Sequence, residues 1–390
     1  MIQIKNLQDC CGCSACAQRC PKQCIQMVQD KEGFLYPQIN KNQCIDCGLC
    51  EKICPFLNQP TPNQAIKAFA AYNTDSQIRK NSSSGGIFSL FAEWIIQQQG
   101  VVFGASFNSE WDIVHVYITR LNELHKLQGS KYIQSNIGQS FKEVKSFLDN
   151  GKKVLFSGTP CQISGLKHFL RKEYSNLFTI DFICHGVPSP LIWQLYLNET
   201  ISKHHKQKSD IKSINFRNKD KGWKDFQFTI NARPYLVNES MGENIYLKAF
   251  LSNLILRPSC HSCRVKSGRS GSDITIGDFW RVENVIPEWN DNKGTSAIII
   301  NSKKGEELFS GIKCINQLTH LEKIIHYNPA YSQNAKPHPR RQHFFTHLNP
   351  QKSIYKQIGQ TFPLKARGQT FPLKARLKQT IKRTLPFLFR

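Results

Sequence analysis

The feature that most constrains this chain is a run of four cysteines that occurs twice near its start. Ten of the fifteen cysteines fall within the first 54 of 390 residues. Eight of them follow the spacing C-x2-C-x2-C-x3-C, and each time a proline comes directly after the fourth cysteine. The spacing predicts two metal clusters held by thiolates. The runs are Cys10, Cys13, Cys16, Cys20 and Cys44, Cys47, Cys50, Cys54.

This is the spacing of bacterial ferredoxins with two 4Fe–4S clusters, in which the fourth cysteine of each run binds the other run's cluster. We therefore expect a crossed arrangement and a protein that moves single electrons. Gly12 and Gly48 let the backbone pass close to inorganic sulfide. Cys11 and Cys24 lie outside the pattern and are expected to be small buried side chains. The expected ligand sets are Cys10, Cys13, Cys16, Cys54 and Cys44, Cys47, Cys50, Cys20.

Two other kinds of cysteine site fit these runs less well. Structural zinc sites use paired C-x2-C arms rather than triplets closed by C-P. A disulfide framework would suit a secreted chain, but residues 1–10 do not have the pattern of a signal peptide. Fifteen cysteines without a secretory signal predict a reducing compartment, the cytoplasm. No apolar run is long enough to span a bilayer.

The length of the chain requires at least one domain beyond a ferredoxin module. We expect the module at 1–57, a linker at 58–65, a larger domain at 66–335 and a basic tail at 336–390. Strand and helix patterns alternate in the larger domain, and residues 211–240 look β-rich. The chain is therefore expected to be α/β, and α+β overall, with a mixed sheet in its larger domain.

The net charge of +24 is concentrated toward the C-terminus. Residues 323–390 contain fourteen Lys or Arg and no Asp or Glu. Such a segment could bind an anionic membrane, an acidic partner or nucleic acid, or could be a solvated extension. Nucleic acid is the least favoured partner because no recognition motif is present. The tail also repeats GQTFPLKAR in tandem at 359–367 and 368–376, and two copies are too few for a repeat architecture.

A second group of cysteines lies in the larger domain. Cys161 is expected in the first turn of a helix capped by Thr159, where the helix dipole stabilises a thiolate. Cys184 ends the next strand, and Cys260 and Cys263 form a C-x2-C pair. Ligands bind at the carboxyl ends of neighbouring strands in α/β sheets. Three interpretations stay open here: a third 4Fe–4S cluster, a structural zinc site, or a redox-active pair beside two buried cysteines.

Several motifs in residues 66–310 jointly resemble the coenzyme F420 hydrogenase/dehydrogenase beta-subunit family, to which plant 7-hydroxymethyl chlorophyll a reductase is related. One position departs from the pattern, because Arg281 stands where members commonly have glycine. The motifs are Ser84–Gly86, Gly129–Ser135, Phe156–Gln162, Cys184–Ser189, Phe216-Arg217 with Lys221–Trp223, and Ser272–Trp280.

The resemblance implies a flavoprotein, usually with FAD, beside an iron–sulfur cluster, and so favours a third 4Fe–4S cluster at the central cysteines. The chain has no G-x-G-x-x-G fingerprint. The turn 82–86 could instead cradle a pyrophosphate at a helix N-terminus, or could simply cap that helix. The expected flavin-binding residues are Ser84, Gly85, Gly86, Ser130, Lys131, Tyr132, Gln134 and Ser135.

Together these features predict an oxidoreductase that passes electrons between its clusters and a flavin. The flavin would reduce or oxidise a small organic substrate or a deazaflavin-type coenzyme. An external carrier such as ferredoxin or a reduced deazaflavin would exchange electrons with the clusters. His185 is the best candidate for a proton donor, the alternative being a structural hydrogen bond. A non-catalytic electron-transfer subunit that serves a partner enzyme is the alternative function.

Overall fold

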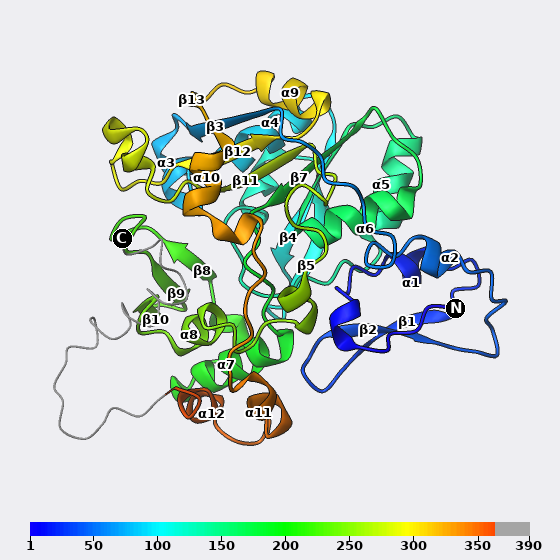
Figure 1. Cartoon of the computed structure of the whole chain (residues 1–390). Coiled ribbons are helices and arrows are strands. Elements are labelled where there is room, and N and C mark those ends of the chain that lie inside the picture. The colour runs from blue at the N-terminus through cyan, green and yellow to red at the C-terminus, as the bar shows by residue number, and fades with distance from the viewer. Residues whose placement is uncertain (363–390) are drawn as a thin grey trace.

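The computed structural model describes residues 1–362, and a mixed eight-stranded sheet lies at its centre (Figure 1). The strand order is β13-β3-β12-β11-β7-β6-β4-β5. Neighbours from β11 to β4 run parallel, and all other neighbours run antiparallel. The expected α/β fold with a mixed sheet is confirmed. The strands are β3 (Lys67–Tyr72), β4 (Val101–Phe107), β5 (Ile113–Ile118), β6 (Val154–Gly158), β7 (Leu177–Phe182), β11 (Ile274–Asp278), β12 (Ser296–Ile300) and β13 (Ile315–Thr319).

Helices cover both faces of this sheet because alternate strand residues point to opposite sides. Val102 packs with α4 (Ile87–Gln97) and α9 (Lys303–Ser310) on one face. Phe103 packs with α5 (Ser140–Asp149) and α6 (Pro160–Leu170) on the other. The sheet is therefore buried on both sides. The remaining helices around it are α3 (Ser76–Asn81) and α10 (Leu321–Tyr327), with 3-10 turns at Leu121–Lys126, Val282–Asn284, Pro287–Trp289 and Pro329–Tyr331.

A second layer lies beyond the carboxyl ends of the parallel strands (Figure 1). Its antiparallel sheet has the order β10-β9-β8, as expected for the β-rich region. One apolar core joins this sheet to the helices that surround it. The elements are β8 (Ser213–Asn218), β9 (Gln227–Asn231), β10 (Tyr235–Ser240), α7 (Pro190–Lys203), α8 (Ile245–Leu251), α11 (Arg341–Thr346), α12 (Ile354–Gly359) and a 3-10 turn at Lys208–Asp210.

Residues 336–362, which we assigned to a basic tail, are part of this packed layer. The side chains of Phe344, Phe345, Ile354 and Ile358 are buried in its core. Glu199 of α7 accepts hydrogen bonds from the Ser353 hydroxyl and from the backbone at the start of α12. Buried apolar side chains therefore fix this basic segment in the packed layer. The repeated GQTFPLKAR copies fall almost entirely outside the described residues.

The N-terminal module is a small unit that packs against α6 (Figure 1). It contains an antiparallel hairpin of β1 (Ile25–Gln29) and β2 (Leu35–Ile39). Two short helices, α1 (Ala15–Arg19) and α2 (Leu49–Lys52), carry cysteines of the two runs, and Leu7–Asp9 is a 3-10 turn. Ile53 and Phe56 join the core beneath α6. No helix within residues 1–362 is long and apolar enough to cross a membrane.

Candidate functional site

The two cysteine runs follow the same backbone path. Gly12 and Asp46, at equivalent positions, both adopt left-handed φ angles, and so do Ser14 and Gly48. The backbone N–H of Gly12 points to the Cys10 sulfur and that of Asp46 to the Cys44 sulfur, each at 3.4 Å. Hydrogen bonds from the backbone to sulfur ligands are a standard means of tuning iron–sulfur clusters. Each run therefore builds a turn that aims three sulfurs at one place.

The structure brings Cys10, Cys13 and Cys16 together with Cys54. The Cys16 thiol interacts electrostatically with all three, and burial raises its pKa well above the ordinary value. Burial likewise raises the pKa of Cys54 to about 11. Burial also raises the pKa of Cys10, whereas a contact with the Cys11 thiol lowers that of Cys13. Buried thiols that are disfavoured as free thiolates become favourable ligands when a cluster supplies positive iron. This is the first of the two crossed sets.

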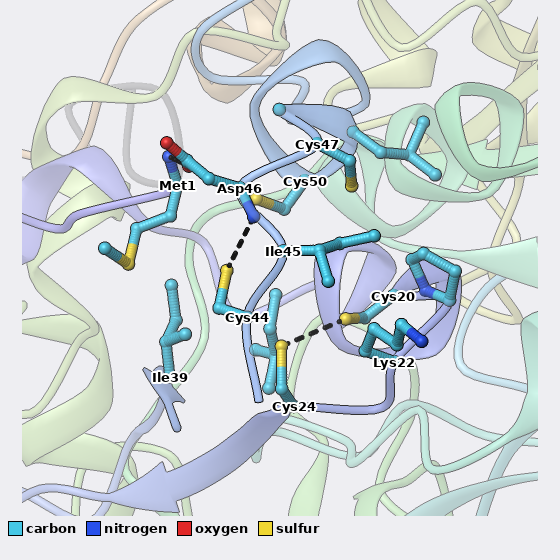
Figure 2. A pocket seen from close by; sticks show the side chains of 14 residues that line it. Met1, Cys20, Lys22, Cys24, Ile39, Cys44, Ile45, Asp46, Cys47 and Cys50 are labelled. Carbon is cyan, nitrogen blue, oxygen red and sulfur yellow. Dashed lines mark hydrogen bonds and ion pairs between the residues drawn. The ribbon is translucent and has the colours of Figure 1, made fainter. Parts of the chain in front are cut away.

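The second crossed set lies at the outer end of the module. Figure 2 shows Cys20, just after α1, beside the same pocket as Cys44 and Cys47 of the following loop and Cys50 of α2. Cys24 also lies here, with its sulfur 3.4 Å from that of Cys20. Unlike the first set, this one reaches the surface, because Cys47 is exposed.

The four cysteines of the larger domain also converge. Cys161 lies in the first turn of α6, where Thr159 caps the helix as expected and its backbone N–H donates to Gln162 at 2.9 Å. The Cys184 thiol interacts electrostatically with Cys260, Cys161 and Cys263, and burial raises its pKa well above the ordinary value. Three separate segments of the fold thus deliver four thiols to one buried place.

Two details of this central set were not expected. The pKa of Cys161 is lowered to about 7, and the first cause is a hydrogen bond from the Cys11 thiol, which also contacts Cys13. The helix dipole is therefore not the main influence. In addition, no group of three or more His, Cys, Asp or Glu side chains in residues 1–362 is spaced to hold a single metal ion.

A cavity of about 390 Å³ lies next to the central set. Cys184 and His185 form part of its wall, and Trp280 and Asp278 lie elsewhere in it. Most of the expected flavin-binding residues line it: Ser84, Gly86, Ser130, Lys131, Tyr132 and Ser135. Its volume falls in the range of small-molecule sites.

Gly85 and Gln134 are not among the residues that line this cavity. A side chain at Gly85 would meet the Ala71 carbonyl oxygen at 2.5 Å, so glycine is needed there for close packing against the sheet. The Gln134 Nε2 donates to the Cys11 carbonyl oxygen at 3.0 Å, and so this side chain points toward the N-terminal module. Both residues therefore contact the structure behind the cavity wall and not the cavity itself.

The turn that precedes α4 places the N-terminus of this helix at the cavity. The Ser84 carbonyl accepts from the buried Lys219 ammonium at 2.8 Å, and the Gly85 carbonyl accepts from the Asn73 N–H at 2.7 Å. Gly86 and Ile87, at the start of the helix, line the cavity. The N-terminus of α4 therefore borders the cavity, where its helix dipole favours an anion.

Lys131 and Tyr132 also line the cavity, in a segment whose Ser130 N–H donates to the Ser83 hydroxyl of this turn at 2.6 Å. Burial lowers the pKa of Lys131 to about 7, and its ammonium donates to the carbonyls of Gln128 and Gly129. The Tyr132 ring stacks on Phe250 at a centroid distance of 4.7 Å. The cavity thus has a cation and an aromatic face.

His185 makes the structural hydrogen bond that was the alternative to a catalytic role. Its Nε2 lies 2.7 Å from the Asn253 Oδ1. Burial lowers the pKa of His185 to about 4, so the ring is neutral near pH 7 and donates its Nε2–H to Asn253. A neutral ring with this proton already engaged is a poor proton donor.

The cavity also has a polar wall that the motifs indicated only in part. Arg217 forms an ion pair with Asp278, with Nη1 and Oδ2 3.0 Å apart, and donates to the Tyr132 hydroxyl. The Trp223 Nε1 donates to Asp278, and its ring stacks on Trp280 at 4.7 Å with an interplanar angle of 7°.

Arg281, the position that departs from the family pattern, does not narrow this cavity. It is not among the lining residues, and its Nη1 lies 3.8 Å from Glu283 Oε1. Its backbone has a φ of 57°, in the left-handed region that favours glycine. The conformation explains why glycine suits this position.

Two regions of the chain match known protein families. The family described as the C terminus of the beta subunit of coenzyme F420 hydrogenase/dehydrogenase matches residues 151–323. This match spans most of the larger domain and includes the central cysteines. A "4Fe-4S dicluster domain" matches residues 9–58. The resemblance drawn from the motifs is therefore confirmed, and the N-terminal module is an iron–sulfur domain.

Individual relatives cover only parts of the chain. The F subunit of the F(420)H(2) dehydrogenase of Methanosarcina mazei is 22% identical over 162 residues, which are 39% of this chain and 46% of that protein. A ferredoxin of Mycolicibacterium smegmatis is 32% identical over 75 residues, 18% of this chain and 65% of that protein. The chain thus spans less than two thirds of each of these relatives. With the two family matches, these relatives make the chain an iron–sulfur protein related to subunits of oxidoreductase complexes.

A solved structure of the F420-reducing [NiFe] hydrogenase complex from Methanosarcina barkeri is also similar. It has 17% sequence identity and a TM-score of 0.46, and the match covers 77% of this chain and 91% of that chain.

Proposed function

We propose that this chain is an iron–sulfur flavoprotein that passes single electrons between three 4Fe–4S clusters and an FAD bound in the cavity. One observation carries this proposal: Cys184 belongs both to the central cysteine set and to the wall of the cavity. A cluster and a small molecule held at these two places would be neighbours, with no other structural layer between them.

The chemistry of the cysteine sets supports 4Fe–4S clusters at all three places. A tetrahedral zinc site with Zn–S bonds of about 2.3 Å would hold its sulfurs about 3.8 Å apart. The absence, within residues 1–362, of any set spaced for one ion favours a larger cluster over zinc at the central cysteines. The Lys266 ammonium, which donates to the Cys184 carbonyl at 2.6 Å, would offset the negative charge of a thiolate cluster.

The cavity residues fit a flavin dinucleotide by their chemistry. The N-terminus of α4 and Lys131 would hold the anionic diphosphate. Tyr132 and Trp280 offer aromatic faces to planar rings. A bound flavin would supply the conversion between two-electron and one-electron transfer. Arg217 and Asp278 would orient the ring through fixed hydrogen-bonding groups.

The partners follow from the same arrangement. Cys47 is exposed beside Ile45, whose side chain is 59% exposed. An external carrier such as a ferredoxin could therefore exchange electrons at the outer end of the module. The cavity would accept a small organic substrate or a deazaflavin-type coenzyme, in keeping with the F420 chemistry for which the relatives are named.

The test is the content of iron, acid-labile sulfide, zinc and acid-released flavin in one anaerobic, reconstituted sample of the full chain. About twelve iron and one FAD per chain would support the proposal. Cys184→Ser should lose about four iron, whereas Cys314→Ser, at a half-buried cysteine outside all three sets, should lose none. About eight iron with one zinc and no flavin would overturn it.

A second candidate function is a non-catalytic subunit that delivers electrons to a partner enzyme. The exposed sulfur of Cys47 supports it, because such a module can donate to any docked acceptor. The two functions differ in one assay. The isolated chain reduces a small acceptor in the cavity only in the first case, and Lys131→Met should abolish that reduction without changing the iron content.

A further inference from the structure

Arg257 is a buried arginine at the junction of the N-terminal module and the larger domain. It directly precedes the 3-10 turn Pro258–Ser262, which carries Cys260, and its side chain is 0% exposed. Its Nε donates to the Cys10 carbonyl at 2.9 Å and its Nη2 to the Leu35 carbonyl at 2.9 Å. Its Nη1 donates to the Gln134 Oε1 at 3.0 Å. Every hydrogen-bond partner is thus a neutral oxygen, and the guanidinium also lies over the neutral Tyr36 ring at 4.3 Å.

This guanidinium has no carboxylate partner among residues 1–362. The other fully or nearly buried arginines do have one: Arg79 pairs with Asp291 at 2.7 Å and Arg217 with Asp278 at 3.0 Å. A buried charge without a counter-charge is strongly unfavourable. The structure must therefore provide negative charge for Arg257 in another form.

Cysteine thiols of the N-terminal module and of the central set both lie near Arg257. Its electrostatic partners include Cys10 and Cys11 of the module and Cys260 of the central set. A side chain at Gly12 would meet its Nη1 at 2.7 Å, so the first run passes directly over the guanidinium. Thiolates that bind a cluster carry the negative charge that the carboxylates supply elsewhere.

The two cysteine sets also touch each other at this junction. A side chain at Gly165 of α6 would meet the Cys13 Cβ at 2.8 Å, so the helix whose first turn carries Cys161 lies against the first set. Between them, the buried Cys11 thiol interacts electrostatically with those of both Cys13 and Cys161. No layer of residues separates the sets.

We propose that Arg257 is a counter-charge shared by the cluster of the Cys10 set and the central cluster, and that it sets the reduction potentials of both. This rests on the cluster assignments of the proposed function. One electron leaves one cluster and enters the other, and no proton moves. A cation near both clusters stabilises the added electron in either position, which raises both potentials and keeps the transfer between them close to balanced.

Lys266 is a second cation near the cysteines, but it lies near only one of the two sets. It is also buried, and it donates to the carbonyls of Cys184 and Ala330. Its electrostatic influence falls on Cys184 and Cys263, both in the central set. Lys266 therefore belongs to one cluster, whereas Arg257 lies between two.

The experiment is redox titration of the reconstituted full chain, followed by electron paramagnetic resonance. Arg257→Met should affect two clusters, the central one and the one held by the Cys10 set. At a fixed potential, the ratio of reduced to oxidised cluster should fall about tenfold for each, which means that each reduction potential falls by about 59 mV. The outer cluster serves as an internal reference and should not shift. Lys266→Met should shift the central cluster alone, and Arg257→Lys should stay close to the wild type.

Arg264 is the matched control, because it also joins the two parts of the chain. It donates to the Phe56 carbonyl and pairs with Asp9, both at 2.7 Å, but it is partly exposed. Arg264→Met should shift both potentials far less than Arg257→Met, because the Arg264 charge is partly solvated and already paired with Asp9. If Arg257→Met does not take up full iron, Gln134→Glu neutralises the same guanidinium in place and should lower the same two potentials.

The outcomes separate this inference from the proposed function. A full iron content with unchanged potentials in Arg257→Met or Gln134→Glu would overturn the sharing of Arg257 and leave the clusters in place. A shift of the central cluster alone would also overturn it. Absence of the third cluster from the wild type would instead overturn the proposed function, which the iron and sulfide content of the same sample reports.

Discussion

The ion pair between Arg217 and Asp278 allows a sharp test of the cavity's polar wall. The Arg217 side chain is 4% exposed and that of Asp278 is 18% exposed. Asp278→Asn keeps the shape and an acceptor for the Trp223 Nε1, but leaves the guanidinium without a counter-charge. Removing one partner of a buried pair costs about 3–5 kcal/mol. We expect about 3 kcal/mol, because water reaches part of the carboxylate.

The reverse change should cost less. Arg217→Met removes the cation and leaves an aspartate that is partly solvated and still bonded to the Trp223 indole. We expect a loss of about 2 kcal/mol, in the range of charged hydrogen bonds. The double variant should then be more stable than the sum of the two single effects predicts, with a coupling energy of about 1.5 kcal/mol or more.

The assay is anaerobic urea unfolding of the cluster-loaded chain, followed by tryptophan fluorescence. Trp223 and Trp280, which stack beside the pair, report on this region directly. If Asp278→Asn costs less than about 0.5 kcal/mol, or if the two effects simply add, the pair is not the buried interaction argued above. Iron content serves as the control that all variants carry the same clusters.

Three further predictions concern other groups. Burial raises the pKa of Asp181 to about 6, above its unfolded value, so stability is lost as pH rises through 6. Relative to Asp181→Asn, the wild type should therefore gain about 1.3 kcal/mol between pH 7 and pH 5 in urea unfolding. Because the pKa of Lys131 is about 7, binding of pyrophosphate in a fluorescence competition with FAD should weaken about tenfold from pH 6 to pH 8. Lys131→Met should bind weakly at both pH values. Cys11→Ala should keep its full iron, whereas Cys13→Ala should lose the cluster of its set; equal losses would make Cys11 a ligand.

Most of the fold could be predicted because the sequence signals are local. Pro160 and Pro190 follow a capping residue, and each starts a helix as expected. The β-rich character of 211–240 likewise came from short runs of strand-forming residues. The crossed cysteine pattern depends only on spacing, and the structure places its members in two groups.

The rest depends on contacts between distant parts of the chain. Arg257 reaches Cys10 and Leu35, which lie 247 and 222 residues away, and nothing near Arg257 in the sequence indicates these partners. Gln134 belongs to a motif that lines the cavity, yet its side chain turns to the opposite side. In the basic segment, Phe344 and Phe345 were the available signal for a packed core, and the charge of the segment obscured it.

The two cysteine runs share one backbone path but have different surroundings. Cys13 and Cys16 are buried where the module meets the larger domain, whereas Cys47 faces solvent. Oxidants and chelators act where they have access. With the three proposed clusters bound, damage in air should therefore proceed from the outside inward, with the outer cluster lost first while the inner pair survives. A preparation with about eight iron after brief exposure to air would then lack its contact with external carriers, although the electron path around Arg257 would still be intact.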